Sequence, residues 1–399
     1  MKKKLSIIGG GTTSLFLAAI IDTDIYDVTI FEKNTAIGRK FLVAGDGGFN
    51  LTHSEELSSF KSKYTPALFL DDALDNFSNV DLRIWLLSLG IPTFIGSSGR
   101  VFPQKGIKPI EVLKYIEAYL IKKNVKFQFK KTFTGWGSEN HLEFNSKETV
   151  KTDYAVFSLG GSSWKVTGSD GSWLNIFNKK GIEIVPFRSS NCAFKINWHE
   201  KFIKRNEGEP LKNISISLKD RTQKGEVVIT NFGIEGNAIY ALSPEIQTVL
   251  ASKSEVVVYV DCKPPFNVET VIKKITDSKS NTTTTLKEEL KLPRAIVDLI
   301  KMTLTKEEFL DVQILAQYIK SFPLTIVDSA PLDEAISTSG GISLTAVDSN
   351  FELKELKNNF CIGEMLDWDA PTGGYLIQAC ASMGVNLAHQ LNDKYNEVK

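Results

Sequence analysis

The sequence predicts an α/β fold in which a nucleotide-binding domain is built from two separate pieces of chain, with a second domain inserted between them. Three observations lead to this prediction. Roughly the first 30 residues show the pattern strand, glycine turn, helix and strand. The pattern changes to alternating strands near residue 188, and a strand–turn–helix pattern returns near residue 330. We therefore assign residues 1–187 and 330–399 to the nucleotide-binding domain and residues 188–329 to the insertion.

The elements of the first piece follow from their apolar patterns. "KLSIIG" and "YDVTIFEKN" are strand-like runs that flank the apolar, helix-length stretch "TTSLFLAAII", and a strand–helix–strand unit implies a parallel sheet. Residues 67–90 and 108–124 show helical patterns. "KFQFKKTFTGWGSENHLEFN" alternates like a strand that leads into a hairpin, and "YAVFSLGG" is typical of a buried strand that ends in glycines.

The insertion has a different pattern. "LKNISISLKD", "KGEVVITNFG" and "EVVVYVDC" are typical of antiparallel strands. "SKSNTTTTLKEEL" indicates a surface loop, with Thr285 and Glu288 at capping-box spacing before a helix. Helical patterns follow in "AIVDLIKMTL" and "FLDVQILAQYI". After the insertion, "NFCIG" predicts a strand and "YLIQACASMGVNLAHQL" predicts a helix.

Composition argues against several classes of protein. The chain has 399 residues, with 47 Lys and Arg against 47 Asp and Glu, so its net charge attracts neither nucleic acid nor an anionic membrane. The four cysteines stand far apart and the four histidines are scattered, which argues against a disulfide framework and a metal site. The apolar run after "MKKK" stops at three glycines, too early for a signal peptide. We expect a cytoplasmic protein without membrane segments, metal or a nucleic-acid partner.

The turn after the first strand, "IIGGGTTS", carries the first binding motif. Gly9 and Gly11 occupy the first two positions of a GxGxxG fingerprint, and Ser14 stands in place of the third glycine. In such a loop the first glycine makes the tight turn and the second lets a pyrophosphate approach the backbone. The phosphates then bind amides at the helix N-terminus, where Thr12 and Thr13 lie. An ordinary turn is the alternative, but this turn follows a strand and opens a helix.

Glu32 supports the same interpretation. It ends the second strand, where an acidic side chain binds the ribose hydroxyls of a dinucleotide, and Lys33 follows it in the predicted site. A solvated carboxylate at the strand end is the alternative. Together, the glycines and Glu32 imply an adenine dinucleotide with a free ribose 2′-hydroxyl. FAD and NAD both satisfy this requirement.

A cationic, glycine-rich stretch, "GRKFLVAGDGGFN", distinguishes the two cofactors. A domain that binds only NAD needs no such stretch after its second strand. Here Arg39 and Lys40 are placed to reach a pyrophosphate or a flavin edge, and the glycines let the backbone lie flat against a planar ring. A basic surface loop is the alternative. The other residues of this stretch that we assign to the cofactor are Gly45, Gly47, Gly48 and Asn50.

The segment "CIGEMLDWDAPTGGYLIQA" completes the pattern. Glu364 and Asp367 follow a strand at positions suited to the hydroxyls of a ribitol chain. Gly373 and Gly374 open a helix whose N-terminal amides would stabilise the negative charge of a reduced flavin. A helix cap with exposed acids explains one such motif but not three in this order, so the sequence favours FAD. The flanking residues in the predicted site are Gly363 and Tyr375.

Six blocks of the chain resemble, in order, those of the BaiN-like NAD(P)/FAD-dependent flavoproteins, which have the glutathione-reductase-type FAD fold. The blocks are "GRKFLVAGDGGFNLTH", "SSGRVFP", "LGGSSWKVTGSDG", "TNFGIEGNAIYALS", "STSGGI" and "GEMLDWDAPTGGY". The resemblance runs essentially from end to end. It implies FAD held non-covalently in a split Rossmann-type domain, with an inserted domain that has a β-barrel-like part and a helical part.

The resemblance also implies roles for particular residues. Asn50 would lie beside the isoalloxazine ring, and Gly160 and Gly161 would end the strand that passes the dinucleotide. Arg100 and Trp164 are candidates for the substrate pocket, with a structural ion pair and a place in the core as the respective alternatives. The ADP half and the nearby flavin edge would be held by Gly9, Gly11, Glu32, Arg39 and Lys40, and the ribitol and pyrimidine side by Glu364, Asp367, Gly373, Gly374 and Tyr375.

The chain departs from the family pattern at two positions. Phe49 stands where members commonly carry a cysteine, so a role that depends on that cysteine is absent here. Ser14 replaces a glycine, which affects only the tightness of the first turn.

These observations predict an FAD-dependent oxidoreductase in which hydride passes between flavin N5 and a small organic substrate. NAD(P)H is a candidate reductant that docks transiently, since no second dinucleotide motif is evident. The other possibility is an oxidase, in which the substrate itself reduces the flavin and oxygen reoxidises it. The alternative is a module with structural FAD whose insertion docks a protein or RNA partner. An NAD-only dehydrogenase ranks last because it leaves the later motifs unused. No catalytic acid or base stands out.

Overall fold

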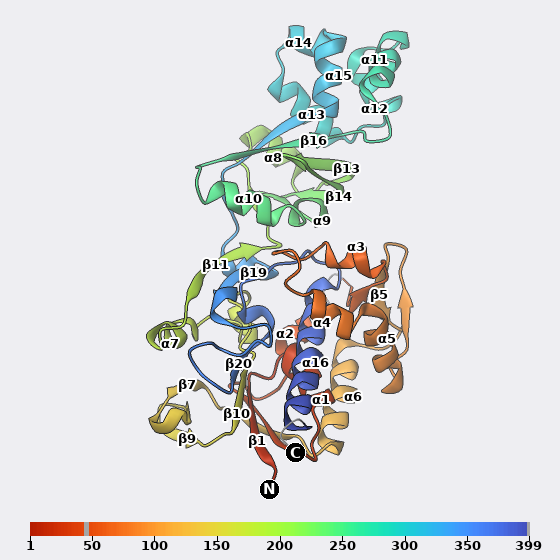
Figure 1. Ribbon diagram of the computed structural model, residues 1–399. Coiled ribbons are helices and arrows are strands. Elements are labelled where there is room, and N and C mark those ends of the chain that lie inside the picture. The colour runs from red at the N-terminus through yellow and green to blue at the C-terminus, as the bar shows by residue number, and fades with distance from the viewer. Residues whose placement is uncertain (44–47, 397–399) are drawn as a thin grey trace. The chain divides into compact units, whose positions relative to one another are not determined.

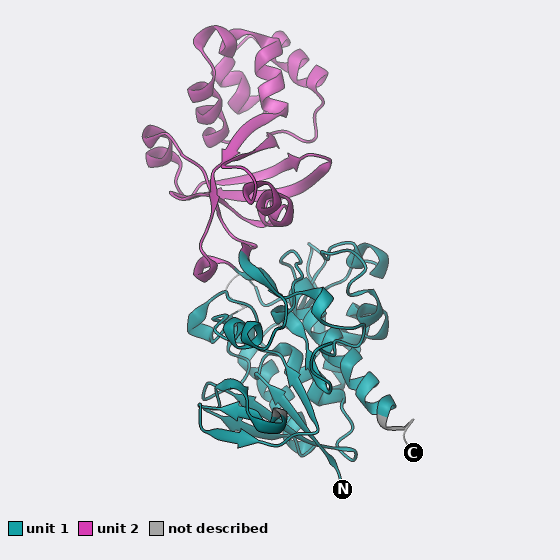
Figure 2. Cartoon of the chain, turned by 60° about the vertical axis from the view of Figure 1, so that its left-hand side comes forward, with its two compact units in different colours: residues 1–188, 336–399 teal, residues 189–335 magenta. Residues whose placement is uncertain are grey.

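The computed structural model describes residues 1–43 and 48–396, and the chain divides into two compact units (Figure 1). Unit 1 combines residues 1–188 with residues 336–399, and unit 2 comprises residues 189–335, as Figure 2 shows. The divisions predicted from the sequence lie at 187/188 and 329/330. In the structure the second division lies later in the chain, because residues 330–335 group with unit 2.

The core of unit 1 is a five-stranded parallel sheet in the order β20-β10-β1-β2-β6. In the central strand β1, Ile7 lies opposite Ile30 of β2 and opposite Val156 of β10. The sheet therefore grows in opposite directions from β1, and ligands bind such sheets outside the strand ends at this switch point. The strands are β1 (Lys3–Ile8), β2 (Tyr26–Glu32), β6 (Lys126–Phe129), β10 (Tyr154–Phe157) and β20 (Asn359–Cys361).

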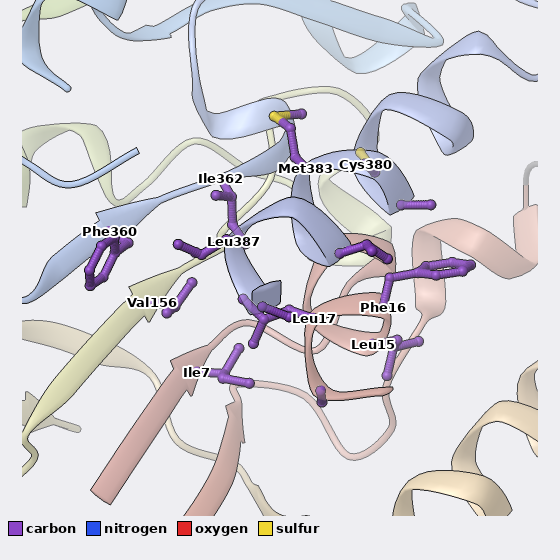
Figure 3. Packing of buried hydrophobic residues seen from close by; sticks show 14 of the residues in the cluster. Ile7, Leu15, Phe16, Leu17, Val156, Phe360, Ile362, Cys380, Met383 and Leu387 are labelled. Carbon is purple, nitrogen blue, oxygen red and sulfur yellow. The ribbon is translucent and has the colours of Figure 1, made fainter. Parts of the chain in front are cut away.

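Two helices from opposite ends of the chain, α1 (Thr12–Ile20) and α16 (Tyr375–Asn396), pack against each other over this sheet. Gly384 makes their close approach possible, because a Cβ there would lie 2.5 Å from the carbonyl oxygen of Thr13. Figure 3 shows side chains of β1, β10, β20, α1 and α16 in one cluster. Leu17 and Leu387 in it are fully buried, which stabilises the fold by about 1.5–3 kcal/mol for each side chain.

The remaining elements of unit 1 surround this core. Residues 67–90, predicted as helical, form two helices, because Ser78 begins a new one with a capping box to Asp81. The other helices are α2 (Arg39–Val43), α3 (Leu57–Lys61), α4 (Asp71–Asn76), α5 (Asn79–Ser88), α6 (Pro109–Lys122) and α7 (Leu174–Lys179). The other strands are β3 (Thr52–His53), β4 (Thr93–Ile95), β5 (Arg100–Pro103), β7 (Phe133–Trp136), β8 (Leu142–Phe144), β9 (Glu148–Val150), β11 (Ile184–Ser190) and β19 (Ser337–Ile342).

Unit 2 contains a seven-stranded antiparallel sheet in the order β17-β16-β13-β14-β15-β12-β18. Only Val327 separates β17 from β18, which lie at opposite ends of this order, so the sheet must curl round on itself. This confirms the β-barrel-like part of the prediction. The strands are β12 (Phe194–Lys195), β13 (Pro210–Leu218), β14 (Arg221–Ile229), β15 (Gly233–Glu235), β16 (Val256–Asp261), β17 (Phe322–Ile326) and β18 (Asp328–Ser329).

Helices complete unit 2, and one of them corrects the sequence analysis. The predicted surface loop "SKSNTTTTLKEEL" contains α12, because the side chain of Asn281 accepts a hydrogen bond from the amide of Thr284 and caps the helix earlier than predicted. The helices are α8 (Glu200–Asn206), α9 (Asn237–Tyr240), α10 (Ser243–Leu250), α11 (Val268–Asp277), α12 (Thr282–Glu288), α13 (Arg294–Thr303), α14 (Lys306–Leu310) and α15 (Val312–Lys320). Among the described residues, no helix has the length and apolarity to cross a membrane.

Candidate cofactor site

Unit 1 contains a cavity of about 490 Å³ at the carboxyl ends of the parallel strands. Its lining includes residues that directly follow β1, β2, β10 and β20. It also includes residues from 38–43, from 48–50 and from 364–374. The segments that the sequence analysis assigned to one cofactor therefore meet in one cavity.

Most of the predicted site residues line this cavity. They are Gly9, Gly11, Thr12, Thr13, Glu32, Lys33, Arg39, Lys40, Gly48, Asn50, Arg100, Gly160, Trp164, Glu364, Gly373 and Gly374. Five predicted residues are not among its lining: Ser14, Gly161, Gly363, Asp367 and Tyr375. Gly45 and Gly47 lie outside the described residues.

The turn between β1 and α1 shows why its glycines differ. Gly9 has a φ of +100°, and a Cβ there would lie 2.3 Å from the carbonyl oxygen of Ser158, so no other residue fits. At Gly11 a Cβ would meet no protein atom within 4 Å, so this position opens onto free space. Ser14 donates a hydrogen bond to the carbonyl of Gly9 and shares another with the hydroxyl of Ser158. The serine thus joins the turn to the end of β10.

Glu32 is tied to the same turn. One carboxylate oxygen accepts a hydrogen bond of 2.8 Å from the amide of Gly10. The other accepts two from Asn34, one from its amide at 2.7 Å and one from its side chain at 2.8 Å. A carboxylate has about four acceptor positions, so Glu32 keeps capacity for a hydroxyl group of a ligand while it fixes the glycine turn.

The cations near this end of the cavity have protein partners. Lys33 binds Asp170 at 2.9 Å. Burial opposes ionisation of Asp170, but hydrogen bonds from Lys33 and Ser172 outweigh it, so the pKa of Asp170 is lowered. Arg39 donates to the side chain of Asn34 and to the carbonyl of Val166, both at 2.8 Å. Arg39 therefore connects the loop after β2 to the loop after β10.

Lys40 and Glu364 form an ion pair in the cavity lining. The ammonium group lies 2.9 Å from a carboxylate oxygen of Glu364 and also donates to the hydroxyl of Ser163 at 2.7 Å. Only 13% of the Glu364 side chain is exposed. Residues from the two pieces of unit 1 are thus joined inside the cavity.

The two glycines after β10 have different environments. Gly160 lines the cavity, and its carbonyl accepts a hydrogen bond of 3.0 Å from the indole of Trp173. Gly161 instead packs on Thr338, whose hydroxyl would lie 2.2 Å from a Cβ at that position. Nearby, the buried hydroxyl of Ser169 lines the cavity and has no hydrogen-bond partner in the described chain. Such a group usually has a partner, which points to a polar ligand here.

The C-terminal segment closes the other side of the cavity. Gly373 and Gly374 line it directly before α16, and a Cβ at Gly374 would lie 2.5 Å from the backbone of Thr52. Asp367 has a different position from the one predicted for it: its carboxylate accepts a hydrogen bond from the amide of Gly340 at 2.8 Å and lies outside the lining. It acts there as a support for β19.

Three further residues of unit 1 have environments that bear on the sequence predictions. Phe49, which replaces the family cysteine, is buried and makes an edge contact with Phe41 at a centroid distance of 4.9 Å. Trp164 has a φ of +61° and lines the cavity rather than filling the core. Burial raises the pKa of the lining thiol of Cys380 to about 12, so this thiol stays protonated at neutral pH and is not a nucleophile.

Sequence reasoning missed Ser158, Ser169, Trp173 and Cys380 as lining residues. Ser158 lies in the predicted strand "YAVFSLGG", close to the glycines that end it, and this position was a signal for its placement. The other three lie on a loop and on a helix face whose directions depend on tertiary packing.

The residues present fit a dinucleotide. Gly11 leaves open space at a helix N-terminus, Glu32 retains acceptor capacity, and Ser169 has an unsatisfied hydroxyl. A parallel sheet with a switch point, a glycine turn that opens α1 and a second glycine turn before α16 are the features expected of a Rossmann-type flavoprotein of the oxidoreductase class.

The chain belongs to the family described as the HI0933-like protein Rossmann domain, which it matches over residues 3–390. It is 26% identical over 392 residues to a ribosomal RNA dihydrouridine synthase of Haemophilus influenzae, covering 93% of this chain and 94% of that protein. It is 25% identical over 400 residues to a 3-dehydro-bile acid delta(4,6)-reductase of Clostridium scindens, covering 94% and 95%. A ribosomal RNA dihydrouridine synthase of Escherichia coli is 21% identical over 388 residues, covering 93% and 94%. These matches confirm the resemblance to the BaiN-like FAD-dependent oxidoreductases.

Proposed function

We propose that this protein is an FAD-dependent reductase that adds hydride to a carbon–carbon double bond conjugated to a carbonyl group, with a reduced nicotinamide nucleotide as electron source. The observation that carries the proposal is the single cavity in which the dinucleotide turn of α1 and the glycine turn of α16 meet. Bound there, the flavin supplies hydride transfer, and the protein supplies binding, orientation and electrostatics.

The lining suggests how the chain would hold FAD. The amides that follow Gly9 and Gly11 at the N-terminus of α1 would bind the pyrophosphate. Glu32 would bind the ribose of the adenosine half through its remaining acceptor capacity. Glu364, held by Lys40, would accept hydrogen bonds from the ribitol hydroxyls. Gly373 would bring the N-terminus of α16 to the pyrimidine side of the ring.

The bond type follows from the names of the relatives. Making dihydrouridine saturates the ring double bond of uracil, which is conjugated to a carbonyl. The delta(4,6) double bonds of a 3-dehydro bile acid are likewise conjugated to the 3-ketone. Enzymes named for such different molecules share this one chemical step, so we propose the step for this chain and leave the size of the molecule to experiment.

A small organic molecule is the substrate class that we favour, with RNA as the second candidate. Two of the relatives are named for ribosomal RNA. Unit 2, however, carries 19 Lys and Arg against 20 Asp and Glu, and proteins that bind RNA tightly neutralise phosphates with an excess of cations. This charge balance supports a small substrate and gives no support to a module that docks RNA.

The test begins with the visible spectrum of the purified protein after FAD is added. We expect a flavin spectrum that bleaches anaerobically with NADH or NADPH and returns on addition of 2-cyclohexen-1-one. Cyclohexanone and cyclohexene, which have only one of the two groups, are the controls and should not restore it. A protein that binds no FAD contradicts the proposal, and so does a reduced flavin that neither the enone nor unmodified ribosomal RNA reoxidises. Reoxidation by the RNA alone would identify the second candidate as the substrate.

A further inference from the structure

A polar cluster lies beside the glycine turn of α16. His53 in β3 is paired with Arg100 in β5, and directly opposed residues of antiparallel strands project from the same face. The ring of Tyr375 stacks on His53, with a centroid distance of 5.5 Å and an interplanar angle of 18°. The hydroxyl of Tyr375 donates a hydrogen bond to Glu55. Three segments far apart in the sequence thus meet at this point.

Arg100 is exceptional among the cations that line the cavity. The other four, Lys33, Arg39, Lys40 and Lys131, each have a hydrogen-bond or ion-pair partner. Within residues 1–43 and 48–396, the half-buried side chain of Arg100 makes neither kind of contact. A guanidinium has five N–H donors in a fixed fork. A lining arginine that has no partner among these described residues is therefore available to a ligand oxygen.

The neighbouring carboxylate is held away from Arg100. Glu55 accepts a hydrogen bond from the hydroxyl of Tyr375, and burial together with this carboxylate raises the pKa of Tyr375, so the hydroxyl remains a donor at neutral pH. His53 accepts the amide N–H of Glu55 at Nδ1, at 3.2 Å, and donates from Nε2 to the carbonyl of Ser98 at 3.0 Å. These contacts fix Glu55 without an ion pair to Arg100.

The location of Arg100 matches a role at the reacting end of the cavity. A Cβ at Gly373 would lie 3.5 Å from Nε of Arg100. Gly373 immediately precedes the α16 turn that is expected to face the flavin ring, whereas the α1 turn and Glu32 serve the adenosine half. The cation and the helix N-terminus both favour negative charge at the same place.

We propose that Arg100 is a catalytic residue that binds the carbonyl oxygen of the substrate, and that His53, Glu55 and Tyr375 are positioning residues that keep Arg100 unpaired. This inference rests on the proposed function. Hydride adds to the carbon β to the carbonyl, the π electrons of the double bond move to the carbonyl oxygen, and Arg100 stabilises the resulting enolate. A proton from solvent then adds to the α carbon, so the substrate gains two electrons and two hydrogens that the reduced nicotinamide nucleotide and solvent supply.

The first experiment measures binding of an enolate mimic to the oxidised holoenzyme. A substituted phenol such as 4-chlorophenol gives a long-wavelength charge-transfer band when its phenolate lies on an oxidised flavin. We expect the wild-type protein to bind the phenolate and to lower the apparent pKa of the phenol. Arg100→Met should weaken this binding by about 10- to 150-fold, as expected for a hydrogen bond to a charged group. Arg100→Lys should retain part of it.

Arg83→Met is the matched control. Arg83 is equally half-buried and donates to Thr93 at 3.2 Å, but it lies outside the cavity lining. We expect wild-type phenolate binding, FAD content and NAD(P)H bleaching in this variant, and phenolate binding of Arg100→Met is compared with it on protein saturated with FAD. Reduction of the enone should fall by about 100- to 1,000-fold in Arg100→Met alone. Equal losses in both variants, or none in Arg100→Met, would overturn the inference.

The positioning residues have their own test. Tyr375→Phe releases Glu55 to pair with Arg100, so phenolate binding should weaken although Arg100 is intact. Adding Glu55→Gln should restore binding, which a merely structural defect would not allow. No phenolate band in the wild type would overturn the assignment. A band that depends on Arg100 in a protein inactive toward both enone and RNA would instead reject the proposed function and leave the oxyanion site standing.

Discussion

Substituting alanine for Gly11 tests whether the open space in the α1 turn belongs to the cofactor. The φ of Gly11 is −84°, and its Cβ would meet no protein atom within 4 Å, so the protein without FAD should lose at most about 1 kcal/mol through the poorer N-cap. If a pyrophosphate occupies that space, the added methyl group overpacks it. Overpacking costs about 1–3 kcal/mol, which corresponds to a roughly 5- to 150-fold increase in the FAD dissociation constant.

The assay combines quenching of FAD fluorescence with thermal unfolding at several FAD concentrations. Because a ligand that binds only the native state stabilises it by mass action, Gly11→Ala should lose at most about 1 kcal/mol of stability without FAD and should show a smaller upward shift than wild type when FAD is added. Gly9→Ala is the contrasting control, since its clash with Ser158 destabilises the protein with or without FAD. Wild-type FAD affinity in Gly11→Ala would refute the assignment of this space to the dinucleotide.

Three further predictions follow from contacts in unit 1. Ser14→Gly, which restores the GxGxxG fingerprint, should lower the free energy of unfolding by about 1–2 kcal/mol. A glycine within a helix and the loss of the two hydrogen bonds of Ser14 both destabilise the protein. Urea titration measures this change, and a stabilised variant would contradict the prediction. Lys40→Met leaves the carboxylate of Glu364 without its ion-pair partner. A double-mutant cycle with Glu364→Gln should therefore give a coupling of about 1–2 kcal/mol in the free energy of unfolding. If the two substitutions changed this free energy additively, the ion pair would be shown to be unimportant. Burial raises the pKa of Cys380 to about 12, whereas the thiol of an unfolded chain has a pKa of about 8.5. The stability of the protein should therefore fall as the pH rises between these two values. Cys380→Ala should make stability less dependent on pH in this range, and an unchanged dependence would contradict the prediction.

The first strand–helix–strand unit could be predicted from sequence because its signals are local. The apolar runs on either side of Gly9 and the acid at the end of β2 lie within one short segment, and the structure reproduces their order. The curled sheet of unit 2 was predicted less directly. Alternation indicated antiparallel strands, and the resemblance to the family supplied the barrel-like closure.

Partners of individual polar side chains could not be predicted, because they depend on segments brought together by the tertiary fold. Arg39 carries a charge suited to a pyrophosphate, yet it binds Asn34 and the carbonyl of Val166. Asp367 was placed with the cofactor, but its carboxylate binds the amide of Gly340. No periodicity in the sequence indicates which of several nearby donors an acid will choose.

Unit 1 is built from two pieces of chain that the insertion separates, and this order affects when FAD can bind. The β20 strand and α16 come from the last part of the chain. They nevertheless complete the edge of the sheet and the lining of the cavity to which Gly9 also contributes. During synthesis, the early strands must wait for the whole insertion to emerge before their final neighbours arrive. A nascent chain ending within residues 189–335 lacks β20 and α16, so we expect FAD to bind only after the last part of unit 1 has been synthesised.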